Sequence, residues 1–409
     1  MDTKKVAYLA WLGVNYGSTL QAYALNKSIE KLGYLCEVIG GDGFIDGQEP
    51  DPSLKDADPK KYDWQLTKYN FNQFMYKHFV FNKELGTIPG NSMLTLNQLQ
   101  ETEKYAAFGC GSDQIWKPGS FWFSSKQYLH FAPTFKRVSY APSVGWKRIP
   151  ESSMQNVEQW KKWLSGVPYL STREETGTAL VQELTGRHTE TVVDPTMLLT
   201  PAEWVEQMNE PVYSAEIKKI IDSGKKYLLA YFLDHADIFR KKVAALAAKL
   251  GLEIIWLTGR DNVGPLQVNC TETDPAGFVN LINKADFVCV DGFHGTCFSL
   301  NFGKPVAFFT VHRDFDKAND TRVPDLFSRM GLDPDRHIVN PDTNLFQLGR
   351  VFISKDIDLH KFQMMLVKAK RRKMFVILGT HSSNPDVFSE EKTKAVLSMA
   401  KKMGFEFYY

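Results

Sequence analysis

His294 is the residue of this chain whose type and surroundings best suit acid–base chemistry. It lies in residues 291–296, Asp-Gly-Phe-His-Gly-Thr, between an apolar run at Phe287–Val290 and another that starts at Pro305. Strand, tight turn, helix and strand form one parallel crossover, which places this turn at the carboxyl end of a strand beside a helix N-terminus. Anions bind there, and imidazole exchanges protons near neutral pH. We predict that His294 is a general acid/base; the alternative is a core histidine bonded to a backbone group.

Arg173 is a cation predicted at a similar place. It follows the predicted strand Val167–Ser171 and precedes a predicted helix, so it also lies at the carboxyl edge of a sheet. A guanidinium at that edge can bind a carboxylate or phosphate. The alternative is a surface salt bridge with Glu174 or Glu175.

His312, Arg313 and Arg322 follow the predicted strand that ends at Thr310, so they too are placed to bind an anion. The alternative for each is a solvated loop charge. Residues 314–316, Asp-Phe-Asp, mimic a metal-binding signature of some glycosyltransferases, but three-residue matches are common by chance, and we predict no metal.

Two groups in the first half are predicted to hold a sugar. Asn15, Tyr16 and Gly17 occupy the first strand-to-helix loop, where backbone donors and a side-chain amide can bind hydroxyl groups; ordinary turn chemistry is the alternative. Asp113 and Trp116, with Gln114 between them, combine an aromatic ring with polar groups, although Trp116 could equally be a core residue.

The candidate site residues lie in loops that follow predicted strands, and these strands belong to two predicted α/β units. In the first, a strand at Lys5–Leu12 leads to a helix from Ser18, its predicted N-cap, to about Leu32, and then to a strand at Leu35–Ile39. Residues 40–100 are predicted to be an insertion or lid over the first sheet. Further strands are predicted at residues 105–108, 137–141, 167–171 and 191–193.

The second half alternates strands and helices, which predicts another parallel, doubly wound sheet. Its strands are predicted at residues 227–233, 253–257, 287–290 and 306–309, with helices at 236–250, 275–284 and 323–330. Thr200-Pro201-Ala202-Glu203 is a helix start with a cap, Pro at N1 and Glu at N3. We predict domains at residues 1–199 and 200–353, and a helical tail at 354–409.

Composition narrows the class of protein. The chain has 409 residues, of which 43% are hydrophobic and 23% charged, and this predicts a globular protein of two domains. Its net charge of +2 is too small to attract nucleic acid strongly. Its five cysteines are scattered and suggest reduced thiols in the cytoplasm. We see no signal peptide and no apolar run near the ~18 residues that span a bilayer.

Six segments, in order, resemble the polysaccharide pyruvyl transferase family, and together they extend over roughly residues 5–330. They are residues 15–25 (Asn-Tyr-Gly-Ser-Thr-Leu-Gln-Ala-Tyr-Ala-Leu), 111–116 (Gly-Ser-Asp-Gln-Ile-Trp), 139–145 (Ser-Tyr-Ala-Pro-Ser-Val-Gly), 171–174 (Ser-Thr-Arg-Glu), 193–196 (Val-Asp-Pro-Thr) and 291–296, with 302–305 (Phe-Gly-Lys-Pro) behind the last. Each segment alone is a weak signal, and their order makes the resemblance strong.

The resemblance implies two Rossmann-like domains in a GT-B-like arrangement, with the active site in the cleft between them. It also implies transfer of a pyruvyl group from phosphoenolpyruvate, a co-substrate, to a sugar, forming a ketal and releasing phosphate, with no other cofactor. His294 and Arg173 would be catalytic, and the donor would contact Arg173, Gly295, Thr296, Arg313 and Arg322. The first domain would bind the acceptor, a sugar of an exopolysaccharide or capsule, or its lipid-linked precursor.

One departure concerns the donor. The family commonly has Ser or Arg two residues before the histidine, where this chain has Gly292. Another cation, Arg313 or Arg322, must then replace that contact, or the donor differs. Two alternatives stay open: a glycosyltransferase that uses a nucleotide sugar, and a catalytically silent binding subunit.

The tail is basic. Residues 354–409 contain eleven Lys/Arg and six Asp/Glu, a local charge of +5, and the densest cluster, at residues 368–373, precedes an apolar run. This pattern suits peripheral contact with an anionic membrane at its inner face. The alternative is a helix that packs back on the first domain, with its lysines solvated.

Overall fold

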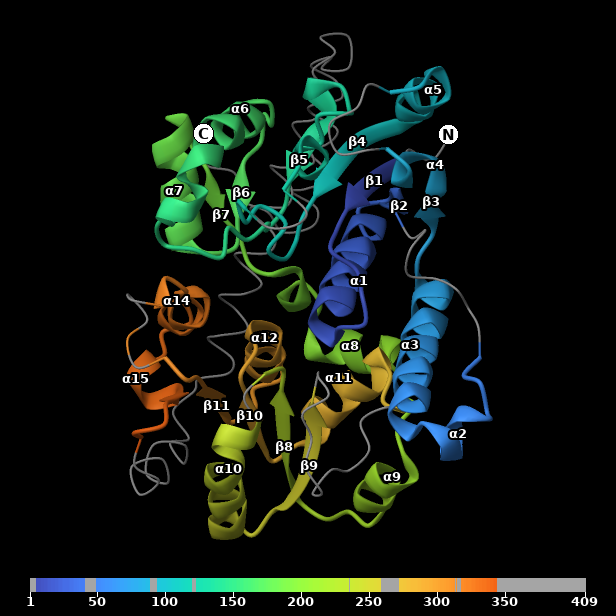
Figure 1. The fold of residues 1–409 in the computed structure, drawn as a ribbon, viewed down its shortest axis with the longest axis vertical. Coiled ribbons are helices and arrows are strands. Elements are labelled where there is room, and N and C mark those ends of the chain that lie inside the picture. Colours follow the sequence, from blue (N-terminus) through green and yellow to red (C-terminus); the bar gives the residue numbers. More distant parts are fainter. Residues whose placement is uncertain are drawn as a thin grey trace, which may run out of the picture.

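The computed structural model describes residues 5–40, 49–88, 94–119, 123–234, 236–258, 272–312, 314 and 318–343. These residues form two parallel β-sheets, one in each half of the chain, with helices packed on their faces (Figure 1). The prediction of an α/β protein with two doubly wound, GT-B-like units is confirmed. The predicted tail, and with it the predicted membrane contact, lies outside the described residues.

The first sheet has five parallel strands in the order β3-β2-β1-β4-β5. The chain moves outward from β1 to β3 and then returns to β4 on the other side of β1. Loops at the carboxyl ends of β1 and β4 therefore diverge, and such a reversal of strand order leaves a crevice for a ligand. The strands are β1 (Lys5–Leu9), β2 (Leu35–Ile39), β3 (Phe81–Asn82), β4 (Tyr105–Cys110) and β5 (Arg137–Ser139).

Helices cover this sheet, and a separate pair of short strands, β6 (Ser171–Thr172) and β7 (Glu190–Thr191), lies beside it. The predicted strands at residues 167–171 and 191–193 are therefore shorter than expected, and they pair with each other. The helices of this half are α1 (Tyr16–Glu30), α2 (Leu54–Ala57), α3 (Pro59–His78), α4 (Lys83–Gly86), α5 (Leu96–Glu103), α6 (Val157–Ser165) and α7 (Glu175–Thr185), with 3-10 helices at Ser125–Tyr128, Thr134–Lys136, Glu151–Asn156 and Pro195–Met197.

The second sheet has five parallel strands in the order β12-β11-β10-β8-β9, so its strand order reverses between β8 and β10. Its strands are β8 (Tyr227–Phe232), β9 (Glu253–Thr258), β10 (Phe287–Val290), β11 (Val306–Phe309) and β12 (Ile338–Val339). Its helices are α8 (Pro201–Gln207), α9 (Ala215–Asp222), α10 (Ala236–Leu250), α11 (Pro275–Lys284), α12 (Phe293–Asn301), α14 (Arg322–Arg329) and α15 (Pro334–His337). The predicted boundary near residue 200 falls at the start of α8.

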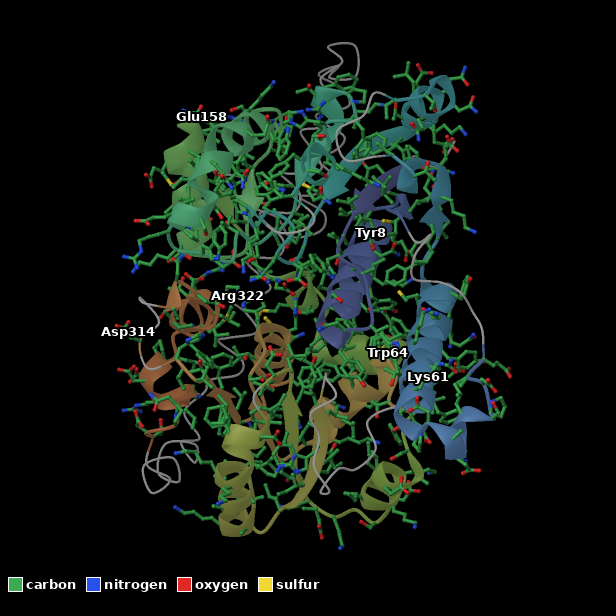
Figure 2. All side chains as sticks on the ribbon, in the orientation of Figure 1. Tyr8, Lys61, Trp64, Glu158, Asp314 and Arg322 are labelled. Atoms are coloured by element: carbon green, nitrogen blue, oxygen red, sulfur yellow. The ribbon has the colours of Figure 1, made fainter. Side chains whose placement is uncertain are left out.

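The two halves share a hydrophobic core rather than meeting through a wet interface. One cluster of buried side chains includes Val6 and Tyr8 of β1 and also Val288 and Val290 of β10. Figure 1 shows α1 directly above α8 and α11, and Figure 2 shows side chains filling the space between the halves. Because burial of apolar surface is the main favourable term in folding, this shared core fixes one half relative to the other.

Residues 40–100 were predicted to be an insertion or lid over the first sheet. The described part of this segment instead adds β3 to the edge of that sheet and α3 to the junction, where α3 contacts α11 of the other half. The side-chain amide of Asn70 donates to the backbone oxygen of Glu272 across this contact. The segment is therefore part of both halves. None of the helices described here is long and apolar enough to cross a membrane.

Helix starts were predicted with mixed success. The cap at Thr200 is confirmed, because its hydroxyl accepts from the N–H of Glu203 and the Glu203 carboxylate accepts from the N–H of Thr200. The prediction for Ser18 was wrong. α1 begins two residues earlier, and the N-cap is Asn15, whose Oδ1 accepts from the N–H of Ser18 at 3.1 Å. Either side chain can cap a helix, so the sequence alone left the choice open.

Asp274 caps α11 and also joins it to the preceding segment. Its Oδ1 accepts from the N–H of Gly277 at 2.6 Å and from the N–H of Val212 at 3.0 Å. Burial raises the pKa of this carboxyl to about 6, against the lowering effect of the two N–H donors. Its negative form is therefore less favourable in the folded protein than in the unfolded chain.

We expect the stability contribution of Asp274 to be fully present below about pH 4 and to be lost as the pH rises through about 6. Asp274→Asn keeps an oxygen for both N–H groups and does not titrate. From pH 4 to pH 7, wild type should lose about 1–3 kcal/mol of unfolding free energy relative to Asp274→Asn in urea unfolding. Asp56→Asn, at an exposed position on α2, is the matched control. A difference that stays constant over this pH range would contradict the prediction.

Candidate active site

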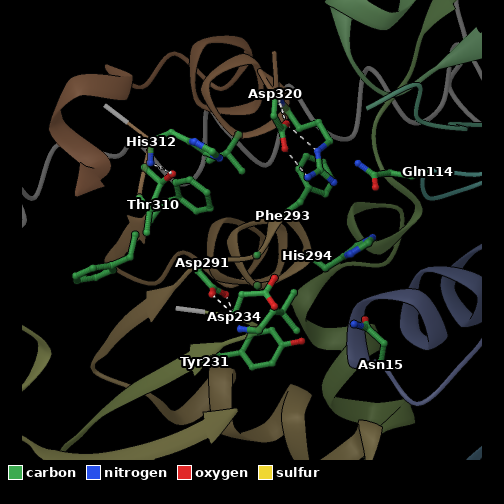
Figure 3. Close-up of a pocket in the computed structure, with 18 of the residues that line it drawn as sticks. Asn15, Gln114, Tyr231, Asp234, Asp291, Phe293, His294, Thr310, His312 and Asp320 are labelled. Atoms are coloured by element: carbon green, nitrogen blue, oxygen red, sulfur yellow. Dashed lines mark hydrogen bonds and ion pairs between the residues drawn. The ribbon is translucent and has the colours of Figure 1, made fainter. Parts of the chain in front are cut away.

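A cavity of about 350 Å³ lies between the halves, at the two places where strand order reverses (Figure 3). The first half contributes Asn15, which follows β1, and Asp113, which follows β4. The second half contributes Tyr231 near the end of β8, residues 291–295 after β10, and the loop after β11. Both crevices that the topology leaves open thus form one cavity.

His294 is the second residue of α12, and its side chain, 12% exposed, forms part of the cavity wall. Its Nε2 lies 3.2 Å from Nη1 of Arg173 and 3.6 Å from Oδ2 of Asp194. Its predicted position, after a buried strand and in the first turn of a helix, is confirmed. Asp194 and Arg173 belong to the first half, so the histidine bridges the two sheets.

Gly17 of α1 permits this close approach. A Cβ atom at Gly17 would lie 2.3 Å from Nδ1, 2.5 Å from Cγ and 2.6 Å from Cβ of His294. No side chain fits there unless α1 and α12 separate. Gly17 was predicted to offer its backbone to a sugar, but in the structure the imidazole of His294 packs against it.

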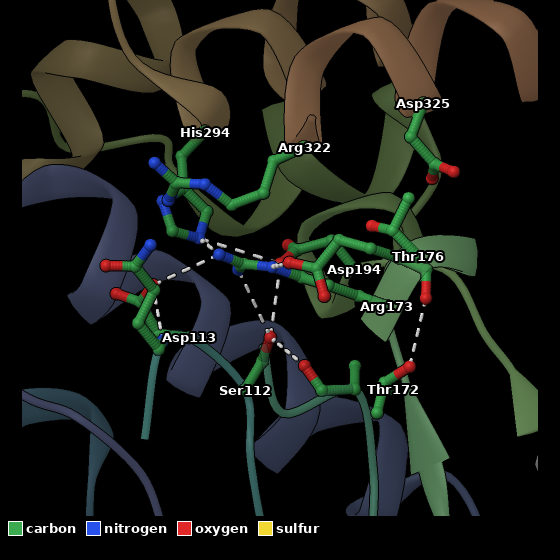
Figure 4. A network of polar contacts seen from close by, with 12 residues as sticks. Ser112, Asp113, Thr172, Arg173, Thr176, Asp194, His294, Arg322 and Asp325 are labelled. Carbon is green, nitrogen blue, oxygen red and sulfur yellow. Dashed lines mark hydrogen bonds and ion pairs between the residues drawn. The ribbon is translucent and has the colours of Figure 1, made fainter. Parts of the chain in front are cut away.

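The guanidinium of Arg173 is the centre of a buried charge cluster (Figure 4). Its side chain is 0% exposed and contacts three carboxylates: Nη1 to Asp194 at 2.8 Å, Nη2 to Asp113 at 3.2 Å, and Nε to Glu174 at 3.3 Å. The guanidinium carbon also lies 4.2 Å from the ring centre of Phe293, a cation–π contact. All three donor groups of Arg173 are therefore occupied within the protein.

Charge pairing keeps most of this cluster ionised. Burial alone would raise the pKa of Asp194 and of Asp113, but His294 and Arg173 hold both below their usual values. Burial would lower the pKa of Arg173, and the carboxylates raise it instead. For Glu174, burial dominates and raises the pKa despite Arg173. Glu174 is thus the carboxylate of this cluster that protonates most readily.

The surroundings of Nε2 suit both protonation states of His294. A guanidinium can only donate hydrogen bonds, so the neutral imidazole accepts from Arg173 through Nε2 and carries its proton on Nδ1. When the ring is protonated, the carboxylate of Asp194 is the nearby acceptor for the Nε2 proton. A histidine with a donor and an acceptor beside the same nitrogen can take a proton there and pass it on during a reaction.

The structure does not present Arg173 to a ligand. It is absent from the cavity wall, and its side chain is fully buried. The alternative raised from sequence, pairing with Glu174, is what the structure shows, except that the pair is buried rather than on the surface. Sequence spacing located the residue correctly, but it could not reveal that Asp113 and Asp194 converge on it from other segments.

Among the arginines in the described part of the chain, Arg322 lines the cavity. Its Nε and Nη2 donate to the two carboxylate oxygens of Asp320 at 2.9 and 2.6 Å, and Figure 4 shows it beside His294. Burial would lower its pKa, but Asp320 raises it, so the guanidinium stays charged. His312 also lines the cavity, whereas Arg313 lies outside the described residues.

Two residues predicted to hold the acceptor are core residues. The ring of Tyr16 stacks on Phe278 at 4.6 Å, and its hydroxyl donates to the backbone oxygen of Thr273. Trp116 is 0% exposed and stacks on Tyr128. Of the two roles left open for Trp116, sugar contact or core packing, the structure therefore shows core packing. Both predictions of sugar contact were wrong because aromatic side chains serve cores as well as sugar sites.

The remaining predicted residues divide between the cavity and the helix interior. Asn15, Asp113 and Gly295 line the cavity. Thr296 is buried, and its hydroxyl donates to the backbone oxygen of Gly292, so it is not available to the donor. In the described part of the chain, no group of three or more His, Cys, Asp or Glu residues could hold a metal ion.

Sequence reasoning missed the role of Asp194, whereas Gln114 lines the cavity beside Asp113, with which it was grouped. Asp194 accepts from the N–H and hydroxyl of Thr196 through Oδ1, which leaves Oδ2 to face Arg173 and His294. Its position shortly after β7 and just before a proline was the available signal. The Gln114 side chain lines the cavity above Gly145, where a Cβ atom would lie 2.6 Å from its amide nitrogen.

Comparisons with known proteins agree with this architecture. A sequence model of the polysaccharide pyruvyl transferase family matches residues 15–313, whereas no curated protein matches the chain. A solved UDP-N-acetylglucosamine 2-epimerase has a TM-score of 0.51 at 12% identity, over 95% of this chain and 100% of that one. MnaA from S. aureus with UDP has a TM-score of 0.46 at 11% identity, with 89% and 91% coverage. The UDP-GlcNAc 2-epimerase of Methanocaldococcus jannaschii has a TM-score of 0.46 at 10% identity, over 90% of this chain and 98% of that one.

The family match covers most of the chain. The protein belongs to the polysaccharide pyruvyl transferase family. The similarity to the epimerase concerns the fold alone.

We expect Gly17→Ala to displace His294, because the added methyl group overlaps atoms close to the α12 backbone. Overpacking of this kind costs about 1–3 kcal/mol of unfolding free energy. The cost, measured by urea unfolding, should be smaller when Gly17→Ala is introduced into a His294→Gly background, where the ring is absent. Equal costs in the two backgrounds would show that the clash does not involve His294.

We expect Arg173→Ala to act first on stability. The change leaves up to three buried carboxylates without a counter-charge, and breaking a buried ion pair typically costs about 3–5 kcal/mol. Thermal unfolding should therefore show a much lower Tm. Lys218→Ala, at an exposed ion pair with Asp222, is the control and should leave Tm nearly unchanged. A wild-type Tm for Arg173→Ala would exclude this role.

Proposed function

We propose that this protein transfers a pyruvyl group from phosphoenolpyruvate to two hydroxyl groups of a sugar, forms a pyruvate ketal and releases phosphate. The acceptor would be a sugar of a surface polysaccharide, an exopolysaccharide or capsule, or of its lipid-linked precursor, and the site of action the cytoplasm or the inner face of the membrane. The observation that carries the proposal is His294, which faces a cavity between the halves in a family that modifies polysaccharides.

The chemistry requires one proton to be delivered and two to be removed. A proton added to the methylene carbon of phosphoenolpyruvate makes C2 electrophilic, and one sugar hydroxyl then attacks C2 and loses its proton. Phosphate leaves, and the second hydroxyl attacks and loses its proton to complete the ketal. His294, placed between Arg173 and Asp194, suits the delivery of the first proton and the removal of the next.

The donor is a small anion, and the described cavity offers it a cation and a helix N-terminus. Arg322 supplies a charged guanidinium at the cavity wall, although Asp320 now occupies two of its donor groups. The first-turn N–H groups of α12 have no partner within the helix, and residues 292–295 at this end line the cavity. We assign Arg322 the contact that the family commonly obtains from the position of Gly292.

The acceptor would lie against the first half. Asp113, with a side chain 20% exposed, can accept hydrogen bonds from sugar hydroxyls while Arg173 holds its carboxylate. Asn15 and Gln114 add side-chain amides at the same wall. Carboxylates and amides that converge on one wall are typical of sites for sugars.

Phosphate release from phosphoenolpyruvate, measured with a panel of galactose-, mannose- and glucose-terminated acceptors, tests the proposal. Release that depends on acceptor supports it. The rival glycosyltransferase predicts no such release and protection against melting by a nucleotide. Neither release nor nucleotide protection, with binding of a sugar alone, would favour the silent binding subunit.

We expect His294→Asn and His294→Ala to lower turnover about 10²–10⁴-fold, because neither side chain exchanges protons near neutral pH. His294→Asn keeps a side-chain amide near Arg173, so its Tm should stay close to wild type. The control is His188→Ala, whose side chain is 76% exposed on the surface. If His294→Asn retains most of the acceptor-dependent phosphate release, the assignment of His294 as the acid/base is wrong.

A further inference from the structure

Tyr231 has a hydroxyl group that the fold leaves unused. The residue is 2% exposed, and its ring packs against Phe278 at 4.8 Å and against Tyr16 at 5.8 Å. Its hydroxyl forms no hydrogen bond with any residue that the structure describes, yet Tyr231 lines the cavity. Buried polar groups normally have a partner, so a hydroxyl of this kind indicates a ligand atom.

The direction of the hydroxyl identifies its neighbours. In Figure 3 it points toward Asn15 and His294 rather than toward Asp291, whose carboxylate is occupied by the N–H groups of Leu233 and Asp234. Asn15 uses Oδ1 to cap α1, which leaves its amide N–H₂ as a donor for the cavity.

The α12 N-terminus borders the same space, because Gly292 caps that helix without a side-chain hydrogen bond and lines the cavity. Three kinds of neutral donor therefore meet beside His294: a phenol, a primary amide and helix N–H groups.

Tyr231 can donate a hydrogen bond there near neutral pH. Burial, together with the nearby Asp291, raises the pKa of its phenol, so the hydroxyl keeps its proton. The hydroxyl can therefore donate to an acceptor atom of a ligand. Asp320, by contrast, lies on the other side of His294 in Figure 3, and its carboxylate accepts from Arg322. The cavity thus has one side with neutral donors, next to the carboxylates of Asp234 and Asp291, and another side with the guanidinium of Arg322.

We propose that Tyr231, with Asn15 and the first turn of α12, binds the carboxylate of the donor substrate. This assignment rests on the proposed function and completes it, because a molecule with a carboxylate and a phosphate needs two anion sites. A phosphate, which carries more charge, suits the guanidinium of Arg322, whereas a carboxylate is satisfied by neutral donors. The methylene carbon that receives the proton would then lie between the two sides, next to His294.

The test uses two tyrosines of the same strand. Tyr231→Phe removes only the hydroxyl and keeps the ring that packs on Phe278. We expect it to weaken phosphoenolpyruvate binding about ten- to a hundredfold in calorimetry, as for loss of a hydrogen bond to a charged group, with Tm unchanged. The matched control is Tyr227→Phe, because the Tyr227 hydroxyl donates to the backbone oxygen of Leu281 at 2.7 Å. That variant should have a lower Tm and wild-type affinity.

A second ligand separates the carboxylate from the rest of the donor. Ethenyl phosphate has the same vinyl phosphate group and no carboxylate, so Tyr231→Phe and wild type should bind it equally. If Tyr231→Phe weakens the binding of ethenyl phosphate as much as the binding of phosphoenolpyruvate, the hydroxyl does not recognise the carboxylate and the inference is wrong. Wild-type affinity of Tyr231→Phe for phosphoenolpyruvate would overturn the inference and leave the proposed function standing. No phosphoenolpyruvate binding by the wild-type protein would overturn both.

Discussion

The buried guanidinium of Arg173 is the interaction on which the site depends. It gathers carboxylates from three separate segments, at Asp113, Glu174 and Asp194, and it also contacts the imidazole of His294. Taking one of these charges out of water alone would cost several kcal/mol, so each member of the cluster is stable only while the others are in place. Arg173 therefore positions the histidine and maintains its acceptor, Asp194, although it is not itself open to a ligand.

The second constraint is the close contact between α1 and α12. Gly17 lets the imidazole of His294 pack against the α1 backbone, and the stack of Tyr16 on Phe278 ties α1 to α11 nearby. A shared core of this kind holds the histidine, from the second half, against Arg173, from the first. Tyr16 and Gly17, which the sequence predicted to contact a sugar, pack at this junction instead.

The cavity at the start of α12 has no side chain at position 292. A Cβ atom there would lie 3.0 Å from Cδ1 of Leu233, so a larger side chain would require Leu233 to move. Arg322 lies at the same cavity and supplies a positive charge, while Tyr231 supplies a neutral donor. Together they offer a physical route by which this chain could bind an anionic donor without a side chain at position 292.

The alternating strands and helices, the cap at Thr200 and the position of His294 after a buried strand could be predicted from the sequence, because they depend on local periodicity and turn chemistry. The other features depend on how the chain packs. The burial of Arg173, the packing of Trp116 in the core and the unused hydroxyl of Tyr231 depend on contacts between segments far apart in the chain. Residue type and spacing carry no information about which distant side chains converge, and that convergence decides whether a polar group is paired within the protein or left for a ligand.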